Sequence, residues 1–265
     1  MGRTLKNGIL SGARSLSGVA LLLASQSGVP ADSGPWTLST GFDYSSGTYG
    51  GSQSTNILYI PFIGKYDIEQ WTFKLTVPYI RVTGPGTVIP GVGTVAGRST
   101  VPITTESGLG DIVATATYAF DMGDASAPAI DLTGKIKFGT ADESKGLGTG
   151  ENDYSIQVDI YKTFDSITGF ATLGYSVLGS SPSIPLNNVF YGAVGASYKF
   201  NDEVSAGLSL YLRQAPSSSS GDQADLTAFV TYKFDQLWKL QGYVLTGLAN
   251  GSPDWAIGAL IGRSF

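Results

Sequence analysis

The sequence predicts an all-β protein: a membrane-spanning antiparallel up-and-down β-barrel of about twelve strands, after a cleaved signal peptide. Three observations favour this fold class. Apolar and polar residues alternate from Trp36 onward, short and long connections follow one another, and only 14% of residues are charged, against about 25% in soluble domains. No segment approaches the roughly 20 consecutive apolar residues of a membrane helix, so spanning is expected from strands.

The alternation gives each segment one apolar face and one polar face. Trp36, Leu38 and Phe42 share one face of the first segment, and Asp43 lies on the other. A soluble β-sandwich would alternate in the same way, because its apolar faces meet in a core. The segments nevertheless cover about 10 to 13 residues, which suits a tilted bilayer span better than the five or six residues usual for sandwich strands. The apolar face is therefore expected to contact lipid and the polar face to line a lumen.

Tight turns and longer glycine-rich loops alternate between the expected strands, as they do in outer-membrane barrels. An even strand number also puts both ends of the barrel sequence on the short-turn side. Pro61 and Pro78 fall inside strand patterns, where each should mark a bulge or a local break in the ladder. The expected strands are 36–46, 54–65, 69–83, 108–121, 128–140, 152–164, 167–179, 188–200, 203–213, 224–235, 237–248 and 254–265.

An aromatic repeat closes four strands on the short-turn side. It is Tyr-Ala-Phe-Asp at 118–121, Tyr-Lys-Thr-Phe-Asp at 161–165, Tyr-Lys-Phe-Asn at 198–201 and Tyr-Lys-Phe-Asp at 232–235. Tyrosine rings favour the headgroup level of a membrane, and Asp or Asn opens a turn. The repeat predicts an aromatic girdle at this end of the barrel.

Residues 1–31 have the three parts of a secretory signal peptide. Arg3, Lys6 and Arg14 give a basic start, an apolar stretch covers 17–24, and Ala31 offers a small residue before a cut ahead of Asp32. An N-terminal amphipathic helix of the mature protein is the alternative. The expected organisation is a signal peptide at 1–31 and a barrel at 32–265 in a Gram-negative bacterial outer membrane.

The absence of histidine and cysteine narrows the functional classes. The chain has no residue of either type, so Ser-His and Cys-His catalytic pairs, imidazole metal ligands and disulfides are all excluded. We expect no enzyme activity, no cofactor and no metal site. The net charge is −5 and becomes more negative once a basic leader is removed, which argues against nucleic acid as a partner.

The C-terminal segment suggests how the barrel is assembled. Phe265 is the last residue, and Trp255, Ile257 and Ile261 share its face. This pattern resembles the C-terminal signal that the barrel-assembly machinery reads in outer-membrane proteins, although Arg263 replaces the usual apolar residue two positions before the end. The expected partners are outer-membrane lipid, the assembly machinery through Phe265, and a small-molecule solute.

Several short motifs follow one another in a fixed order along the chain. They are GFDYSSG at 41–47, Tyr49-Gly50, Trp71, VPYIR at 77–81, GLGD at 108–111, KFGT at 137–140 and KGLGTGENDY at 145–154. Together they resemble one known family, the "MetA-pathway of phenol degradation" family of outer-membrane barrels, over most of 36–265. Members of that family are regarded as candidate transporters, some encoded beside genes of aromatic degradation, so the resemblance implies a barrel that carries small solutes.

Two functions follow from a polar lumen. The first is a channel for passive uptake of small solutes, aromatic or otherwise hydrophobic; the second is a closed structural or envelope-interaction barrel whose lumen is plugged by its own ion pairs. Lys135 and Lys137 are expected to form cross-strand ion pairs with Asp111 and Asp159. The candidate lumen residues are Asp43, Lys74, Asp111, Asp131, Lys135, Lys137, Gln157, Asp159, Tyr211, Arg213 and Asp225.

The longest expected loop, 83–107, offers a candidate constriction. It is rich in Gly, Pro, Val and Thr, and Val88, Ile89, Val92 and Val95 give it an apolar character. Folded inward, it would narrow the mouth and suit an apolar or aromatic solute. A flexible surface loop is the other interpretation.

Overall fold

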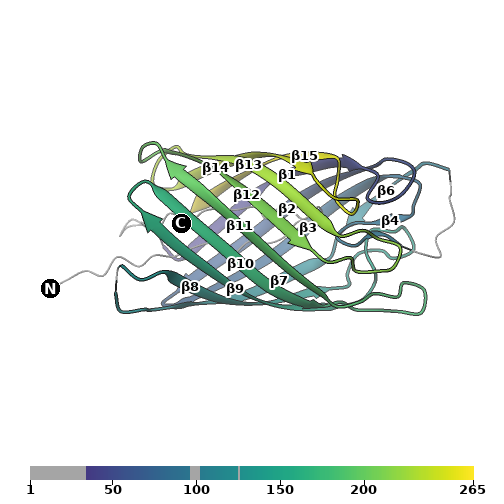
Figure 1. Ribbon diagram of the computed structural model, residues 1–265, viewed down its shortest axis with the longest axis horizontal. Coiled ribbons are helices and arrows are strands. Elements are labelled where there is room, and N and C mark those ends of the chain that lie inside the picture. The colour runs from purple at the N-terminus through teal and green to yellow at the C-terminus, as the bar shows by residue number, and fades with distance from the viewer. Residues whose placement is uncertain (1–33, 96–101, 125) are drawn as a thin grey trace.

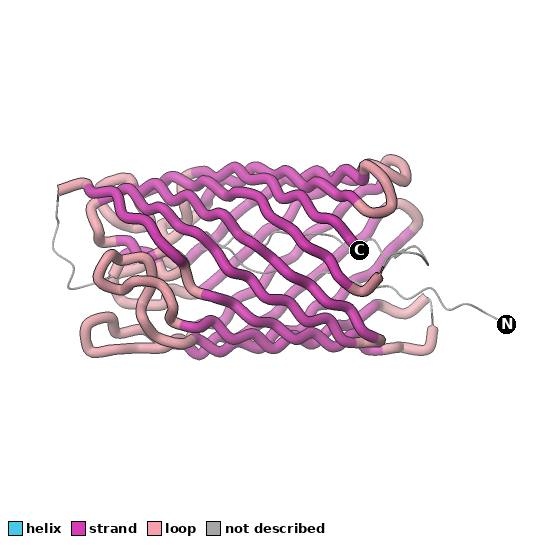
Figure 2. The backbone as a smooth tube through the Cα atoms, turned by 180° about the vertical axis from the view of Figure 1, so that it is seen from behind, coloured by secondary structure: helices cyan, strands magenta, loops and turns pink. Residues whose placement is uncertain are grey.

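The computed structural model describes residues 34–95, 102–124 and 126–265, which form a closed antiparallel barrel with strands wound obliquely around its axis (Figures 1 and 2). The chain enters the wall at β1 (Trp36–Gly47) and leaves it at β15 (Trp255–Ser264), and these two strands pair antiparallel to close the ring. The proposed signal peptide at 1–31 lies outside the described residues. Among the described residues, no helix has the length and apolarity needed to cross a membrane.

The wall has the twelve strands expected from the sequence, with one of them in two pieces. β6 and β7 both pair with β3 and together form the fourth wall strand, which begins at Thr104 rather than at 108 and breaks at 110–111. The remaining wall strands are β2 (Thr55–Ile68), β3 (Trp71–Gly84), β6 (Thr104–Leu109), β7 (Ile112–Phe120), β8 (Ala129–Phe138), β9 (Asp153–Phe164), β10 (Ile167–Val177), β11 (Val189–Lys199), β12 (Val204–Arg213), β13 (Gln223–Lys233) and β14 (Trp238–Gly247).

The two prolines do not disturb the ladder between their own strands. Pro61 and Pro78 are register partners, and the β2–β3 pairing runs unbroken through them. The breaks lie instead in the pairings of β2 with β1 and of β3 with β6 and β7. Each proline lacks the N–H group that would point to that neighbouring strand. The β1–β2 pairing skips Gly41 and Phe42, and β3 passes from β7 to β6 across a bulge at Gly110, whose N–H donates to the Pro78 carbonyl at 2.8 Å.

The outer surface of the wall is apolar, as a lipid-facing surface requires. Large side chains on outward positions stay exposed, among them Leu173 at 67% and Leu208 at 56%. In water, so many exposed apolar side chains would favour aggregation, whereas a bilayer covers them at no such cost. The barrel therefore spans a membrane with its apolar face toward lipid.

The aromatic girdle is present, with one correction. Tyr118 and Phe120 are in edge contact at 5.1 Å, and the pairs Tyr198–Phe200 and Tyr232–Phe234 each repeat this contact at 4.9 Å. Tyr161 does not belong to the girdle and is buried on the inner face. Its repeat is one residue longer, so its tyrosine and phenylalanine are three apart and point to opposite faces of the strand.

The turns separate the two ends of the barrel as predicted. The tight connections at 69–70, 165–166, 200–203 and 234–237 lie at one end together with the longer 121–128, and the other loops, each of seven residues or more, lie at the opposite end (Figure 1). The two tightest turns place a non-glycine residue at positive φ, Glu69 at 52° and Asp165 at 50°. Such backbone angles at the first turn residue match the right-handed twist of the flanking strands.

Glycines on the inner face allow aromatic rings to lie flat along the wall. The Tyr191 ring on β11 covers Gly174 on β10, where a Cβ would lie 2.2 Å from it, and its hydroxyl donates to Gln157 on β9 at 3.2 Å. Tyr243 on β14 covers Gly258 in the same way and donates to Asp43 on β1. Each ring thus bridges two strands across a glycine and leaves the lumen centre free.

Gly174→Ala should destabilise the barrel, because the added methyl group would displace the Tyr191 ring from the wall. We expect a loss of about 1–3 kcal/mol in unfolding free energy, as for other overpacked sites. Urea unfolding in lipid vesicles, followed by tryptophan fluorescence, measures the loss. Gly169→Ala on the same strand is the matched control, since a Cβ there meets nothing within 4 Å. Equal stability of the two variants would contradict the bridging role of Tyr191.

Candidate pore and its constriction

All eleven candidate residues lie on the lumen side of the wall. Ten occupy inward positions of wall strands, and Asp111 lies at the break between β6 and β7. Asp43, Asp131, Asp159 and Asp225 are 0–3% exposed, whereas outward neighbours on the same strands are largely exposed. The full set is Asp43, Lys74, Asp111, Asp131, Lys135, Lys137, Gln157, Asp159, Tyr211, Arg213 and Asp225.

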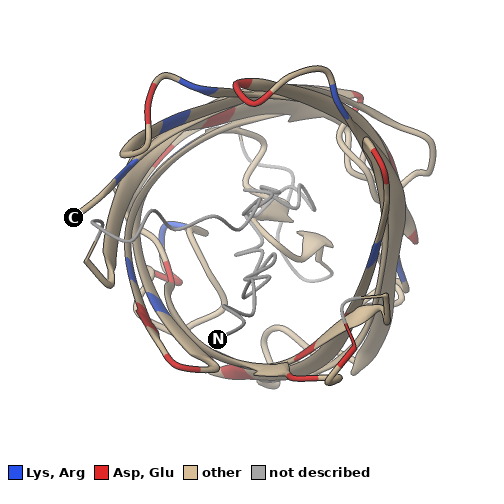
Figure 3. Cartoon of the chain, turned by 90° about the vertical axis from the view of Figure 1, so that its left-hand side faces the viewer, with Lys and Arg blue, Asp and Glu red and all other residues tan. Residues whose placement is uncertain are grey.

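The loop after β3 folds into the mouth of the barrel. It carries a small hairpin of β4 (Val88–Ile89) and β5 (Gly93–Thr94), paired only with each other. Seen along the barrel from the end where the C-terminus lies, the hairpin stands inside the ring of strands (Figure 3). Val88, Ile89, Val92 and Val95 are each buried. The inward interpretation of the loop is therefore confirmed for its described part, and 96–101 lie outside the described residues.

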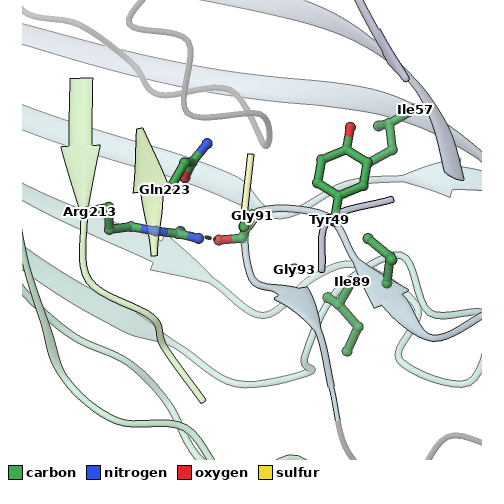
Figure 4. Close-up of a pocket in the computed structure, with 9 residues that line it drawn as sticks. Tyr49, Ile57, Ile89, Gly91, Gly93, Arg213 and Gln223 are labelled. Carbon is green, nitrogen blue, oxygen red and sulfur yellow. Dashed lines mark hydrogen bonds between the residues drawn. The ribbon is translucent and has the colours of Figure 1, made fainter. Parts of the chain in front are cut away.

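Arg213 holds the hairpin tip against the far wall. Its guanidinium donates to the carbonyl of Gly91 (Figure 4) and, at 3.1 Å, to that of Val92. β12, which carries Arg213, is six strands from β3 in either direction around the ring. In a ring of twelve strands that is the opposite side, so the hairpin crosses the whole mouth. Hydrogen bonds from a charged donor contribute about 1.5–3 kcal/mol each.

Two further hydrogen bonds fix the base of the hairpin. The Thr94 hydroxyl donates to the carbonyl of Tyr49 at 2.8 Å, and the Ser217 hydroxyl donates to the carbonyl of Thr94 at 3.3 Å. The Tyr49 phenol in turn donates to the Ser45 hydroxyl at 2.8 Å. Burial raises the pKa of Tyr49 in this loop, so the phenol keeps the proton that it donates. The hairpin is thus tied to β12 and to the loops after β1 and β12.

Two more loops bring apolar side chains into the mouth. Ile184 of the loop 178–188 packs with Ile89, Val92 and Val95 of the hairpin segment. Leu147 of the loop 139–152 joins a second cluster, which continues into the wall. The remaining buried members of that second cluster are Tyr49, Ile57, Tyr59, Ile80, Val82, Val88 and Ala141. The constriction is therefore bordered by apolar groups on several sides.

Sequence reasoning did not identify the apolar part of the wall. Ile57, Tyr59, Ile80 and Val82 face inward, where polar residues were expected. A signal was present in β2, because the run Ile57-Leu58-Tyr59-Ile60 is apolar at every position and does not alternate. A continuous apolar run indicates a strand covered on both faces, and here the loops cover the inner one.

Ion pairs and hydrogen bonds hold the acidic groups against the wall. Lys137 lies 3.0 Å from Asp111 and 2.9 Å from Asp153, on the two strands that flank β8. The first pair was expected, and the second partner is Asp153 because Asp153, not Asp159, is the register partner of Lys137. Asp159 instead accepts hydrogen bonds from Gln157 at 2.7 Å and from Thr172 at 2.6 Å.

Comparison with known proteins identifies the family. The family described as "Putative MetA-pathway of phenol degradation" matches residues 65–263. The chain belongs to this family. No curated protein matches it.

Two solved porin structures share the fold. The NanC porin is 12% identical, with a TM-score of 0.52 over 86% of this chain and 98% of the other. The KdgM porin is 11% identical, with a TM-score of 0.50 over 86% and 99%. A structure titled as the CymD monoaromatic hydrocarbon channel is 10% identical, with a TM-score of 0.47 over 88% and 89%.

Three of the segments that carry the family resemblance, GLGD, KFGT and KGLGTGENDY, meet at one side of the mouth. GLGD at 108–111 supplies Asp111, and KGLGTGENDY at 145–154 supplies Leu147 and Asp153. Asp111 accepts a hydrogen bond from the N–H of Ala141 at 3.0 Å and pairs with Lys137, while a Cβ on Gly108 would lie 3.1 Å from Leu147. In this member of the phenol-degradation family, the quoted motifs thus fold the loop 139–152 onto the broken fourth strand.

Arg213→Ala should release the hairpin tip from the far wall. The chain has no cysteine, so Val92→Cys introduces a single thiol at a site that is 6% exposed. In the native protein, the hydrogen bonds from the charged Arg213 side chain keep the hairpin in its buried position. Without them, we expect a maleimide reagent to label the thiol about tenfold faster. Arg81→Ala, on the exposed outer face of β3, is the control and should leave the labelling rate unchanged. An unchanged rate in Arg213→Ala would show that Arg213 does not fasten the hairpin.

Proposed function

We propose that this protein is an outer-membrane channel for passive uptake of small solutes, with the β4–β5 hairpin as its constriction, and that it is not an enzyme. The hairpin held by Arg213 across the mouth is the observation that carries the proposal. A passive pore needs a wet lumen and a selective narrowing, without a site that binds its solute tightly. The lumen wall supplies fixed polar groups, and the hairpin supplies the narrowing.

Small hydrophobic solutes, aromatic ones among them, fit the constriction best. Ile89, Val92, Val95 and Ile184 form a buried apolar cluster that supports the hairpin. Ile57, Val88 and Ile89 line a small cavity beside Arg213, where a ring would meet apolar surface (Figure 4). The description of the family refers to phenol degradation, which agrees with a solute of this type. Export through residues 1–31 and assembly through Phe265 belong to the same proposal.

The plugged barrel is the second candidate function, and one observation weighs against it. The lumen ion pairs of Lys137 connect neighbouring strands, so they follow the wall and do not cross the interior. The aromatic rings over Gly174 and Gly258 also lie along the wall. Both features favour an interior that solutes can pass.

Single-channel recording of residues 32–265, refolded into a planar bilayer, tests the proposal. We expect stable conductance steps, and we expect steps larger by on the order of twofold when residues 87–95 are replaced by two glycines, because a pore's resistance is greatest at its narrowest part. A two-glycine replacement of 122–127, in the connection between β7 and β8 at the other end of the barrel, is the control and should leave the step size nearly unchanged. Silence from protein shown to be folded and inserted would favour the plugged barrel.

A further inference from the structure

The part of the lumen near the short turns carries a row of lysines that sequence reasoning found only in part. Lys65 on β2 shares the inward face of Ile63, and Lys74 on β3 shares that of Thr76. On the other side of the closure, Lys233 follows the buried Thr231 at a spacing of two. Lys239 precedes the buried Gln241 at the same spacing. We call Lys65, Lys74, Lys233 and Lys239 the lysine belt.

The belt contains two like-charged cross-strand pairs. Lys65 is the register partner of Lys74, and Lys233 is the register partner of Lys239. Like charges directly opposite one another in a ladder are destabilising. Each pair concentrates positive charge on two adjacent strands of the lumen wall.

The two pairs form one continuous surface. The strands between them, β15 and β1, carry only small neutral residues at this level, Gly262 beside Lys239 and Thr37 beside Lys65. Only these two strands separate β14, which carries Lys239, from β2, which carries Lys65. The belt therefore runs over six neighbouring strands, from β13 to β3, which is half of the wall.

Acidic groups near the belt lie at its rim or on the opposite wall. Asp67 pairs with Lys65 at 2.6 Å beside the turn 69–70. Asp131 and Asp159 are register partners on β8 and β9, and β9 is six strands from β15, near the middle of the belt. Lys135 on β8 lies between the belt and these two aspartates. Thr115 on β7 is the register partner of both Lys74 and Lys135. The charge of this part of the lumen is thus divided between a basic half and a smaller acidic sector.

We infer that the lysine belt makes the channel select solutes that carry a carboxylate on an apolar body, such as arenecarboxylates. This inference rests on the proposed function and names its solute class. The small cavity at the hairpin, lined by Ile57, Val88 and Ile89, gives the ring its apolar contact, and the basic half of the lumen beyond it attracts the carboxylate. A charged wall with low-dielectric surroundings raises the local concentration of the opposite ion by about tenfold or more.

Reversal potentials in planar bilayers test the inference with two probes of the same ring and opposite charge, benzoate and benzylammonium. The mature chain should pass benzoate at least about fivefold better than benzylammonium. It should also pass benzoate at least as well as the smaller acetate, because the apolar mouth favours the ring. Two double variants should each reduce the preference for benzoate: Lys65→Gln with Lys74→Gln, and Lys233→Gln with Lys239→Gln. The variant that combines all four substitutions should abolish the preference.

Two controls separate the selectivity from folding and from the pore itself. Lys162→Gln with Arg81→Gln removes two cations from the outer face and should keep the preference for benzoate. The double glutamine variants remove like-charge pairs and should fold. Folding is verified by the change in electrophoretic mobility between unheated and heated samples. Conductance steps with no preference, or with a preference for benzylammonium, would overturn the inference and leave the pore intact. Silence from the folded protein would remove the proposed function and the inference together.

Discussion

The pairing of β1 with β15 is the contact on which the rest of the molecule depends. A strand edge in hydrocarbon would leave several backbone N–H and C=O groups without partners, each at a cost of several kcal/mol, so the sheet is viable in lipid only when it closes. Closure also fixes every residue's face, since a slip by one position would turn polar side chains toward lipid. The inward position of Asp43 and the outward position of Phe42 both follow from this register.

Different parts of the chain set the width of the lumen and its narrowest point: the wall strands set the first and the β4–β5 hairpin sets the second. Glycines such as Gly174 and Gly258 let tyrosine rings lie along the wall and link strands two apart, so the wall gains contacts without filling its centre. Narrowing is left to a segment outside the ladder. The β4–β5 hairpin pairs with no wall strand and is held by side-chain hydrogen bonds, chiefly those from Arg213. Its position can therefore change while the barrel stays intact.

Sequence reasoning succeeds here wherever structure follows a period of two. The strand number, the two kinds of turn and the inward position of residues such as Asp131 and Asp225 all depend on that period. It fails where distant segments meet. Nothing local to Gly91 indicates Arg213, which is 122 residues away, and the apolar inner face at Ile80 is explained only by loops that fold over it. The girdle error at Tyr161 comes from one extra residue, which moves a side chain to the other face.

The order of apolar and charged surfaces along the lumen explains why the lysines lie beyond the constriction. A solute that passes the hairpin exchanges water for apolar contact, which favours its ring and penalises its charge, because an unpaired charge is costly in a dry environment. The wall near the hairpin offers little net compensation, since two carboxylates hold Lys137 and carbonyl groups hold Arg213. The field that draws an anion inward must then come from beyond the constriction, and there Lys65, Lys74, Lys233 and Lys239 face the lumen.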